Sequence, residues 1–583
     1  MLSIILCRAA LGLTQGLALF LLYSAYDAKT WPATDGAIFA PLVLVSVFVP
    51  TILIAGLSNL RPRTLVIWAI VAAVLCIGLG IHDIIRAPTD IRDASRILPS
   101  APLWWALTVG LFIAHGLIVA GDGERAYIAS YPRYFDVIWT LGVQLALSAA
   151  FVGVFWGLLW LGADLFKLIQ IDALHELIKR QWFSIPVTAL ALACALHVTD
   201  VQSGLVRGAR TLALMLLAWL LPLMTLMIVA FLLALPFTGL EVLWSMRRAT
   251  SIMLSAAAML AVLVNAVYQD GQLQGVTQRV LRYVCIVAIV ALVPLIGLAA
   301  YGLALRVEQY GWTPDRVFAL GCVIVGAWGA IGYALAAARF GPSLKWIEAT
   351  NVSGAFVALA ILFALFTPIA DPARIAVASQ VARLEAGQVP PHRFDFDFLR
   401  FRSGRYGTEA LTLLAERKEG TEAAAIAERA RQALERTGLH SRHESVATPQ
   451  MRATNITVVH PAGQGLPDSF LQQDWNADRD RRTIPQCLTR DYTCEAVLVD
   501  LDGDGQLEIL LFGSSSRISS RWFGDSAFKV GPKGWTRLGW IENLHCHGLR
   551  DALRQGRFEL VPPVMKDVEA NGHRLQIKLA DSC

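Results

Sequence analysis

The first 370 residues alternate between long apolar segments and short polar ones. The clearest segment is 211–237, which contains no charged residue and follows Arg210 directly. A helix needs about 20 apolar residues to cross the hydrocarbon core of a bilayer, so this segment is long enough. Pro222 and Pro236 lie inside it, and packed membrane helices tolerate such residues. Because similar segments recur along the chain, a buried helix of a large soluble protein is the weaker interpretation.

We predict about eleven membrane-spanning helices from this pattern. Their expected ranges are 5–26, 38–57, 64–81, 103–120, 137–166, 183–198, 211–237, 252–268, 283–305, 317–338 and 352–370. Tryptophans near the ends of many segments are typical of the aromatic belt of a bilayer protein. Between the fifth and sixth segments, residues 167–182 place apolar side chains at helical spacing opposite charged ones. This pattern predicts an amphipathic helix that lies in the interface.

Orientation has to come from outside the membrane half. The basic residues of the loops are divided about equally between the two sides, so the positive-inside rule selects neither. The first apolar segment has no basic region before it, and we therefore expect a retained span rather than a cleaved signal peptide. The polar residues expected at membrane depth are Gln15, His115, Gln144, His197 and Asn265. We interpret the two histidines as partners in helix–helix hydrogen bonds, with a transport or relay role as the alternative.

Composition changes at Asp371, where the apolar segments end. Asp371 and Pro372 are typical of a helix N-cap and first helical position, and Gly387 is a suitable end for this helix. Phe394, Phe396 and Phe398 then alternate with aspartates, which predicts a strand. Two helices follow in the ranges 408–417 and 421–436, so we expect 371–440 to be a helical neck between a membrane domain, 1–370, and a soluble domain, 441–583.

The last segment mixes short apolar runs with turn signals. The expected strands are 456–459, 495–499, 507–512, 522–530, 535–541 and 574–579, with a short helix at 549–554 and a hairpin turn at 531–534. The predicted fold class is therefore a polytopic α-helical membrane protein with a C-terminal soluble α+β domain.

An acidic loop lies between two of these strands. Asp500, Asp502 and Asp504 alternate along the chain, Gly505 permits a sharp turn, and Glu508 follows. Carboxylates at this spacing can converge on one hard cation, so we predict a calcium site formed by Asp500, Asp502, Asp504 and Glu508. The flanking strands and the lack of an acidic residue at loop position twelve exclude a helix–loop–helix hand; the pattern resembles the loops of integrin-type repeats. The alternative is a hairpin turn that binds nothing.

The cysteines fall into two groups. Cys7, Cys76, Cys194, Cys285 and Cys322 lie in or beside apolar segments and are interpreted as small hydrophobic residues. The soluble domain holds four more, which are Cys487, Cys494, Cys546 and Cys583. An even number suggests two disulfides in an oxidising compartment, with three possible pairings. A zinc site that includes His545 and His547 is the alternative, although the spacing fits no common zinc pattern.

Three segments resemble a family of bacterial inner-membrane proteins known as domain of unknown function 4153. They are residues 31–35 (WPATD), 265–271 (NAVYQDG) and 394–407 (FDFDFLRFRSGRYG). The resemblance covers most of the membrane half and the start of the tail. It implies a polytopic bacterial membrane protein and supplies no activity or catalytic residues.

Composition and motifs together limit the function. The 583-residue chain is 55% hydrophobic and 16% charged, with a mean hydropathy of +0.53, whereas soluble domains carry about 25% charged residues. Its net charge of +5 is spread over many loops, which argues against a nucleic-acid partner. We expect a non-enzymatic protein of the bacterial inner membrane, with the lipid bilayer and an unidentified envelope protein as partners. Its C-terminal domain is expected in the periplasm, where it binds or senses and is stabilised by calcium.

Two alternatives remain open. Breaks at Pro222, Pro236 and Pro294 would suit a transporter, although no carboxylate lies mid-span. A transferase acting on a lipid-linked substrate would need acidic residues at the membrane surface. The candidates for that role are Asp27, Asp35, Asp83, Asp90 and Asp93.

Overall fold

The computed structural model divides the chain into two compact units, Met1–Leu439 and His440–Cys583. It describes residues 2–87, 97–240, 248–269, 276–338, 345–419, 422–436, 447–475, 484–489, 492–513, 525–532, 534–541, 548–561, 568–570 and 573–575. Each unit has its own hydrophobic core.

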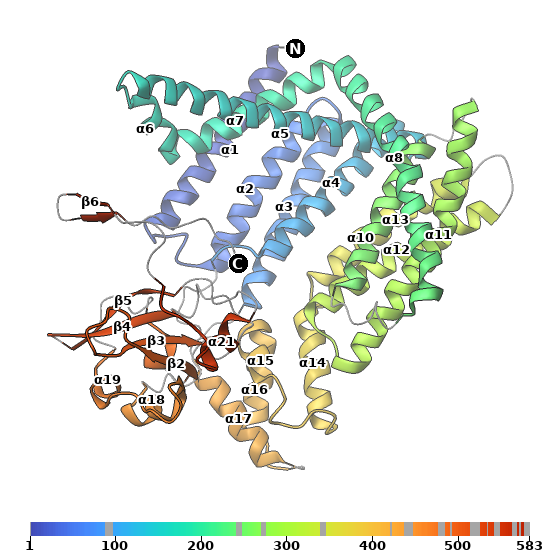
Figure 1. The fold of residues 1–583 in the computed structure, drawn as a ribbon. Helices are drawn as coiled ribbons and strands as arrows, with labels where there is room; N and C mark the ends of the chain where they lie inside the picture. Colours follow the sequence, from blue (N-terminus) through green and yellow to red (C-terminus); the bar gives the residue numbers. More distant parts are fainter. Residues whose placement is uncertain are drawn as a thin grey trace. The chain divides into compact units, whose positions relative to one another are not determined.

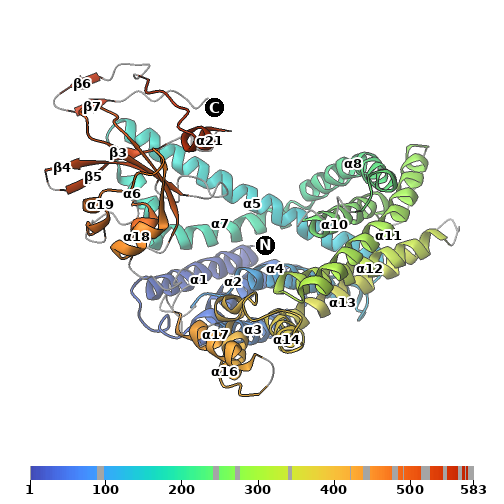
Figure 2. The ribbon, with the colours of Figure 1, turned by 60° about the horizontal axis from the view of Figure 1, so that its bottom comes forward.

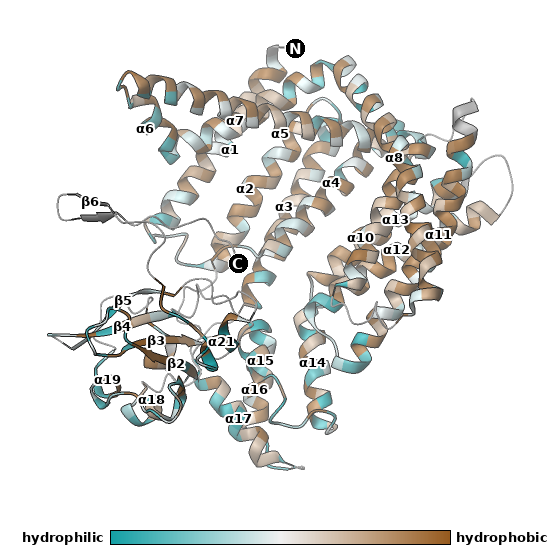
Figure 3. Ribbon diagram, viewed as in Figure 1, coloured by the Kyte–Doolittle hydropathy of each residue, from teal (hydrophilic) through white to brown (hydrophobic). Residues whose placement is uncertain are grey.

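Among its described residues, the first unit contains eleven helices that are long and apolar enough to cross a membrane (Figure 1). They are α1 (Leu2–Asp27), α2 (Gly36–Gly56), α3 (Pro62–Ile85), α4 (Ala101–Glu124), α5 (Tyr131–Leu168), α7 (Gln181–Val201), α8 (Ser203–Thr238), α10 (Ala249–Tyr268), α11 (Val276–Tyr310), α12 (Pro314–Ala338) and α13 (Lys345–Leu365). The predicted membrane helices are confirmed. Apolar residues cover most of their surface, whereas the helices that follow α13 carry more polar residues (Figure 3).

Small residues allow α1 to pack closely against α7, and the two helices run side by side in Figure 2. Gly12 and Gly16 lie one helical turn apart on the same face of α1. A Cβ on Gly12 would lie 2.6 Å from Cβ of Ala193, and one on Gly16 would lie 2.4 Å from Cα of Pro186. Without a hydrophobic driving force between helices in lipid, this close backbone approach is a main source of association.

Two apolar cores organise the rest of the membrane helices. One lies among α8, α10, α11 and α12, around the fully buried Leu221, Leu260 and Ile289. The other lies among α2, α3, α4 and α5, around Leu44 and Leu103.

The segment between α5 and α7 differs from its prediction. Only α6 (Ala173–Lys179) is a separate helix there, and the predicted amphipathic helix over 167–182 is wrong in extent. The apolar residues before Ile169 extend α5 to Leu168 instead, and α7 already begins at Gln181.

Four helices follow the last membrane helix: α14 (Pro372–Glu385), α15 (Phe396–Arg402), α16 (Gly404–Ala415) and α17 (Ala423–Glu435). Asp371 caps α14 as predicted, and Gly387 adopts a left-handed conformation with φ of 70° just beyond its end. The predicted strand at 394–398 is wrong. Asp395 accepts a hydrogen bond from the backbone N–H of Phe398 and starts α15, while Phe394 and Phe396 enter the core formed with α16 and α17.

The second unit is built on a five-stranded sheet with the order β1-β2-β3-β4-β5. Its strands are β1 (Ile456–His460), β2 (Cys494–Val499), β3 (Glu508–Gly513), β4 (Ser526–Gly531) and β5 (Gly534–Trp540); β1 is parallel to β2 and the other pairs are antiparallel. Helices α18 (Pro449–Asn455), α19 (Asp468–Gln472), α20 (Gln486–Thr489) and α21 (Leu549–Arg554) and a small ribbon of β6 (Val568–Ala570) and β7 (His573–Leu575) complete it. Phe470, Trp475, Phe528 and Trp535 form an aromatic core on one face of the sheet.

Candidate functional site

The acidic loop connects β2 to β3. The two strands pair from Cys494 opposite Gly513 to Val499 opposite Glu508, so the ladder closes immediately before the loop. Gly503 and Gly505 have φ angles of 77° and 82°, a region that glycine enters without steric cost. The chain therefore turns tightly at the two positions where the sequence supplies glycine.

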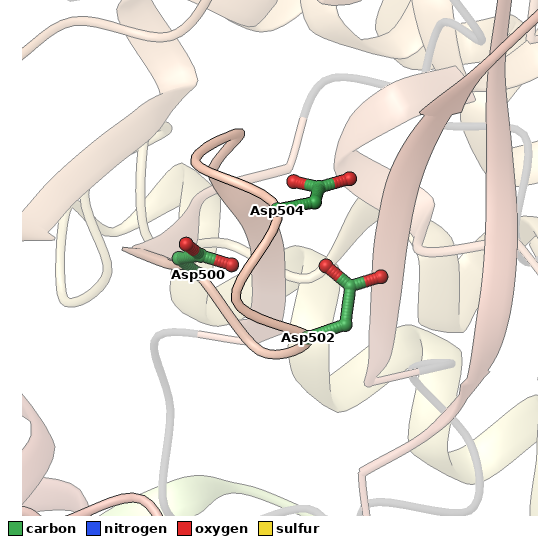
Figure 4. Close-up of side chains that lie close together, drawn as sticks. All are labelled: Asp500, Asp502 and Asp504. Carbon is green, nitrogen blue, oxygen red and sulfur yellow. The ribbon is translucent and has the colours of Figure 1, made fainter.

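Three aspartates meet on this loop (Figure 4). Asp500, Asp502 and Asp504 each offer a carboxylate oxygen, and these oxygens lie within 4.8 Å of one another. Asp500 accepts hydrogen bonds from the backbone N–H groups of Gly503 at 2.7 Å and Gly505 at 2.9 Å. These bonds fold the chain around the Asp500 carboxylate, so that Asp502 and Asp504 lie close to it.

Glu508, the fourth predicted ligand, lies outside this group of oxygens. Its side chain is only 1% exposed, and its Oε2 accepts a hydrogen bond from the backbone N–H of Leu501 at 2.7 Å. Among the described residues, Oε1 has no hydrogen-bond partner. A buried carboxylate oxygen without a donor is costly, so this atom favours a nearby cation.

Lys529 supplies one such cation, and sequence reasoning missed it. Its Nζ forms an ion pair with Asp502, donates to Asp504 at 2.7 Å, and lies 3.6 Å from Oε1 of Glu508. The hydrogen bonds that Lys529 donates to Asp502 and Asp504 raise the pKa of Lys529, and the same ammonium lowers the pKa of Asp504. Lys529 lies on β4 one position beyond the paired Ile509 and Phe528, so only the register of β3 and β4 brings it to the loop.

One disulfide joins Cys487 to Cys494, at the start of β2, with a Cα–Cα distance of 6.1 Å. This bond uses two of the four tail cysteines and rules out a zinc site that includes either of them. Cys546 and Cys583, together with His545 and His547, lie outside the described residues.

The polar residues of the membrane helices form hydrogen-bonded clusters. Arg8 is 2% exposed and bonds to the backbone oxygen of Ile54, to Ser58 and to Asp200, and its Nη1 lies 3.3 Å from Nδ1 of His197. Asp200 therefore neutralises a buried cation, and His197 belongs to the same cluster.

A second cluster joins α5, α10, α12 and α13. Asn265 hydrogen-bonds to Tyr131, Tyr333 and Asn351, and Tyr333 donates to Asn351 at 2.5 Å. Gln15 bonds elsewhere, to the backbone oxygen of Val47 and to Thr51. Asn265 and Gln15 therefore both form hydrogen bonds between membrane helices.

A third cluster joins the C-terminal end of α3 to the N-terminal ends of α4 and α14. Asp83 accepts from the backbone N–H and hydroxyl of Ser100 and pairs with Arg86 at 2.7 Å. Asp371 pairs with Arg86 and with His82. These bonds give Asp83 a structural role. Asp35 also has a structural role, because it caps α2. Asp90 and Asp93 lie outside the described residues.

Segment 403–405 contacts the end of α3 in the same cluster. The backbone N–H of Arg405 donates to the backbone oxygen of Arg86 at 2.9 Å. Gly404 has φ of 57°, and a Cβ there would lie 2.0 Å from that same oxygen. This position therefore admits only glycine, which gives the SGRYG segment a structural explanation.

Comparison with known proteins identifies the family. No curated protein and no solved structure matches this chain. One family model, described as a domain of unknown function, matches residues 16–415, which is more than half of the chain and ends before the second unit. It includes the capped start of α2, the Asn265 cluster and the Gly404 contact, and excludes the acidic loop. The chain therefore belongs to the DUF4153 family of multi-pass membrane proteins.

Proposed function

We propose that this protein anchors a binding or sensing domain at the periplasmic side of a bacterial inner membrane, and that calcium stabilises this domain at the acidic loop. The observation that carries the proposal is the group of aspartate oxygens within 4.8 Å of one another, beside the buried Glu508. Hard cations such as Ca²⁺ prefer carboxylate and backbone oxygens in this kind of turn.

Lys529 is the competing cation. One ammonium balances one of the four negative charges of Asp500, Asp502, Asp504 and Glu508, so the loop stays strongly acidic when the lysine is in contact. A divalent ion would displace Nζ, whose side chain is 25% exposed and has room to swing into solvent. Calcium and the lysine therefore compete for the same oxygens.

Three considerations support a periplasmic location for the domain. Disulfides such as Cys487–Cys494 form and persist in oxidising compartments, which include the bacterial periplasm. An odd number of crossings would place the tail on the side opposite the N-terminus. Calcium loops of exported domains bind with Kd of roughly 0.1–1 mM, a range suited to the outside of the cell.

Calcium titration of the purified full-length protein in detergent tests the metal site. We expect saturable binding with a Kd of roughly 0.1–1 mM, tighter binding by Lys529→Met because the competing ammonium is gone, and loss of binding by Asp500→Asn. Arg537 is a cation on the neighbouring strand β5, so Arg537→Met is the matched control and should leave calcium binding unchanged. If neither the wild type nor Lys529→Met binds calcium at 10 mM, on the order of ten times the weakest expected Kd, the loop is a turn whose counter-ion is Lys529.

A reporter fusion tests the topology separately. Alkaline phosphatase placed after Cys583 should be active, because this enzyme folds only after export to an oxidising compartment. Fluorescence from a cytoplasmic reporter at the same position would instead place the tail inside the cell.

A further inference from the structure

A cavity of about 190 Å³ lies among α1, α2, α4, α5 and α7 in the membrane half. Its walls are mostly apolar, with Phe48, Leu111, Phe112 and Leu141 among them. A cavity of about 150 Å³ holds a benzene ring, so this one accommodates a ring with a few substituents. Another wall residue, Leu145, is 45% exposed, so the cavity opens at the lipid-facing surface of α5.

The charges at this cavity neutralise each other. Arg8 and Asp200 both contribute to its wall and form an ion pair at 3.0 Å. Arg8 is also bonded to Ser58 and to the backbone oxygen of Ile54. Because no net charge faces the cavity from this pair, the geometry favours a neutral guest over an anion or a cation.

His115 provides an unused hydrogen-bond donor at the cavity. Its Nδ1 accepts a hydrogen bond from Nε1–H of Trp68 at 3.1 Å. Trp indole is only a donor, so Nδ1 carries no proton and the neutral ring carries its proton on Nε2. His115 is 6% exposed, and its Nε2 has no hydrogen-bond partner among the described residues. A buried donor without an acceptor is destabilising, and an acceptor on a guest molecule would satisfy it.

The position of His115 matches a guest that enters from the bilayer. His115 precedes the end of α4 at Glu124 by nine residues, which at 1.5 Å per residue is about 14 Å. Cε1 of His115 also lies 3.7 Å from a Cβ built on Gly56, the last residue of α2, so the donor lies between the helices toward that end of α2 and about 14 Å from the end of α4. Gln144 is also a wall residue and makes no hydrogen bond to any described residue, so it offers a second polar contact.

We propose that this cavity binds a neutral, lipid-soluble molecule whose ring-sized head carries a carbonyl, and that the carbonyl oxygen accepts a hydrogen bond from Nε2–H of His115. Nε2 is itself buried, so the proposed hydrogen bond requires the neighbouring apolar side chains to move apart when the guest binds. A quinone head or the ester carbonyl of a lipid supplies the same chemistry. The bond from Trp68 keeps His115 in the donating tautomer, which makes Trp68 a positioning residue.

Competition binding tests the proposal. The full-length protein in lipid nanodiscs is incubated with a radiolabelled short-tailed benzoquinone, and we expect saturable binding. His115→Phe should weaken binding about 5- to 10-fold, the usual effect of one hydrogen bond, and His115→Gln, which keeps an N–H donor, should restore part of it. His175→Phe on α6 is the matched control, because His175 has an unpartnered buried nitrogen but does not contribute to the cavity.

The competitors separate the sources of the carbonyl. Displacement by a diacylglycerol assigns the cavity to a lipid ester, and a failure of that lipid to displace the probe assigns it to a quinone; both support carbonyl recognition. Equal displacement by a long-chain alkylbenzene, or unchanged affinity in His115→Phe, would overturn it. Nitrogen NMR of histidine-labelled wild-type protein gives a readout that needs no variant: the Nε2–H resonance of His115 should move on adding the quinone, and a proton on Nδ1 would contradict the assignment.

Discussion

Replacing Gly404 with alanine tests the contact between the SGRYG segment, 403–407, and the end of α3. The added Cβ would lie 2.0 Å from the backbone oxygen of Arg86, which is the acceptor of the Arg405 N–H. Because the backbone fixes the position of the Cβ and the oxygen is itself a backbone atom, no side-chain rotation relieves the clash. The two segments must separate, and their hydrogen bond is lost.

The cost has two parts. A left-handed φ of 57° costs alanine about 1–2 kcal/mol. Separating the segments leaves the Arg86 oxygen and the Arg405 N–H unpaired, which adds about 1–3 kcal/mol. Gly387→Ala isolates the first part, because Gly387 has φ of 70° and nothing within 4 Å of its added Cβ. The difference between the variants is therefore the cost of the clash alone.

Hydrogen–deuterium exchange of the full-length protein in detergent measures each variant at the helix beside its own substitution. The loss of protection at the first amides of α16 in Gly404→Ala should exceed the loss at the last amides of α14 in Gly387→Ala by about 5- to 150-fold, which is about 1–3 kcal/mol. Equal losses at the two helix ends would refute the contact.

Two further predictions concern helix packing and pH. Gly16→Leu should separate α1 from α7, because Cα of Pro186 lies 2.4 Å from the new Cβ; size-exclusion chromatography after heating should show less folded protein than for Gly78→Leu, whose Cβ has open space. Burial would raise the pKa of Asp371, but the hydrogen bond from His82 and its other partners lower it overall from 3.8. The ionised Asp371 therefore stabilises the fold above pH 3.8, and this contribution is lost as the pH falls below that value. Below about pH 4, near the ordinary pKa of an aspartate, the melting temperature of the wild type should fall more steeply with pH than that of Asp371→Asn.

The membrane helices were predictable because lipid leaves the chain few options. An apolar segment in hydrocarbon must satisfy its backbone groups internally, so its length alone indicates a helix. The alternation at Phe394, Phe396 and Phe398 misled because the pattern is only a few residues long. In a short segment, one aspartate cap at Asp395 outweighs a period of two.

The acidic loop lies between two strands as predicted, but its ion pairs with Lys529 were not predicted. Asp500, Asp502 and Asp504 are neighbours in sequence and necessarily share one turn. Lys529 reaches them only through the pairing of β3 with β4, and the alternation of a strand does not specify its register. Sequence reasoning also missed the Arg8 cluster, because its members come from α1, from the end of α2 and from α7, and the apolar pattern does not specify how these helices pack.

The pairing of Arg8 with Asp200 also sets an order of events during synthesis. The two residues are 192 positions apart, so at about 5–20 residues per second the ribosome completes α7 roughly 10–40 s after α1 has emerged. Throughout that interval the Arg8 guanidinium cannot pair with Asp200, so the ion pair between α1 and α7 is made only after both helices have been synthesised.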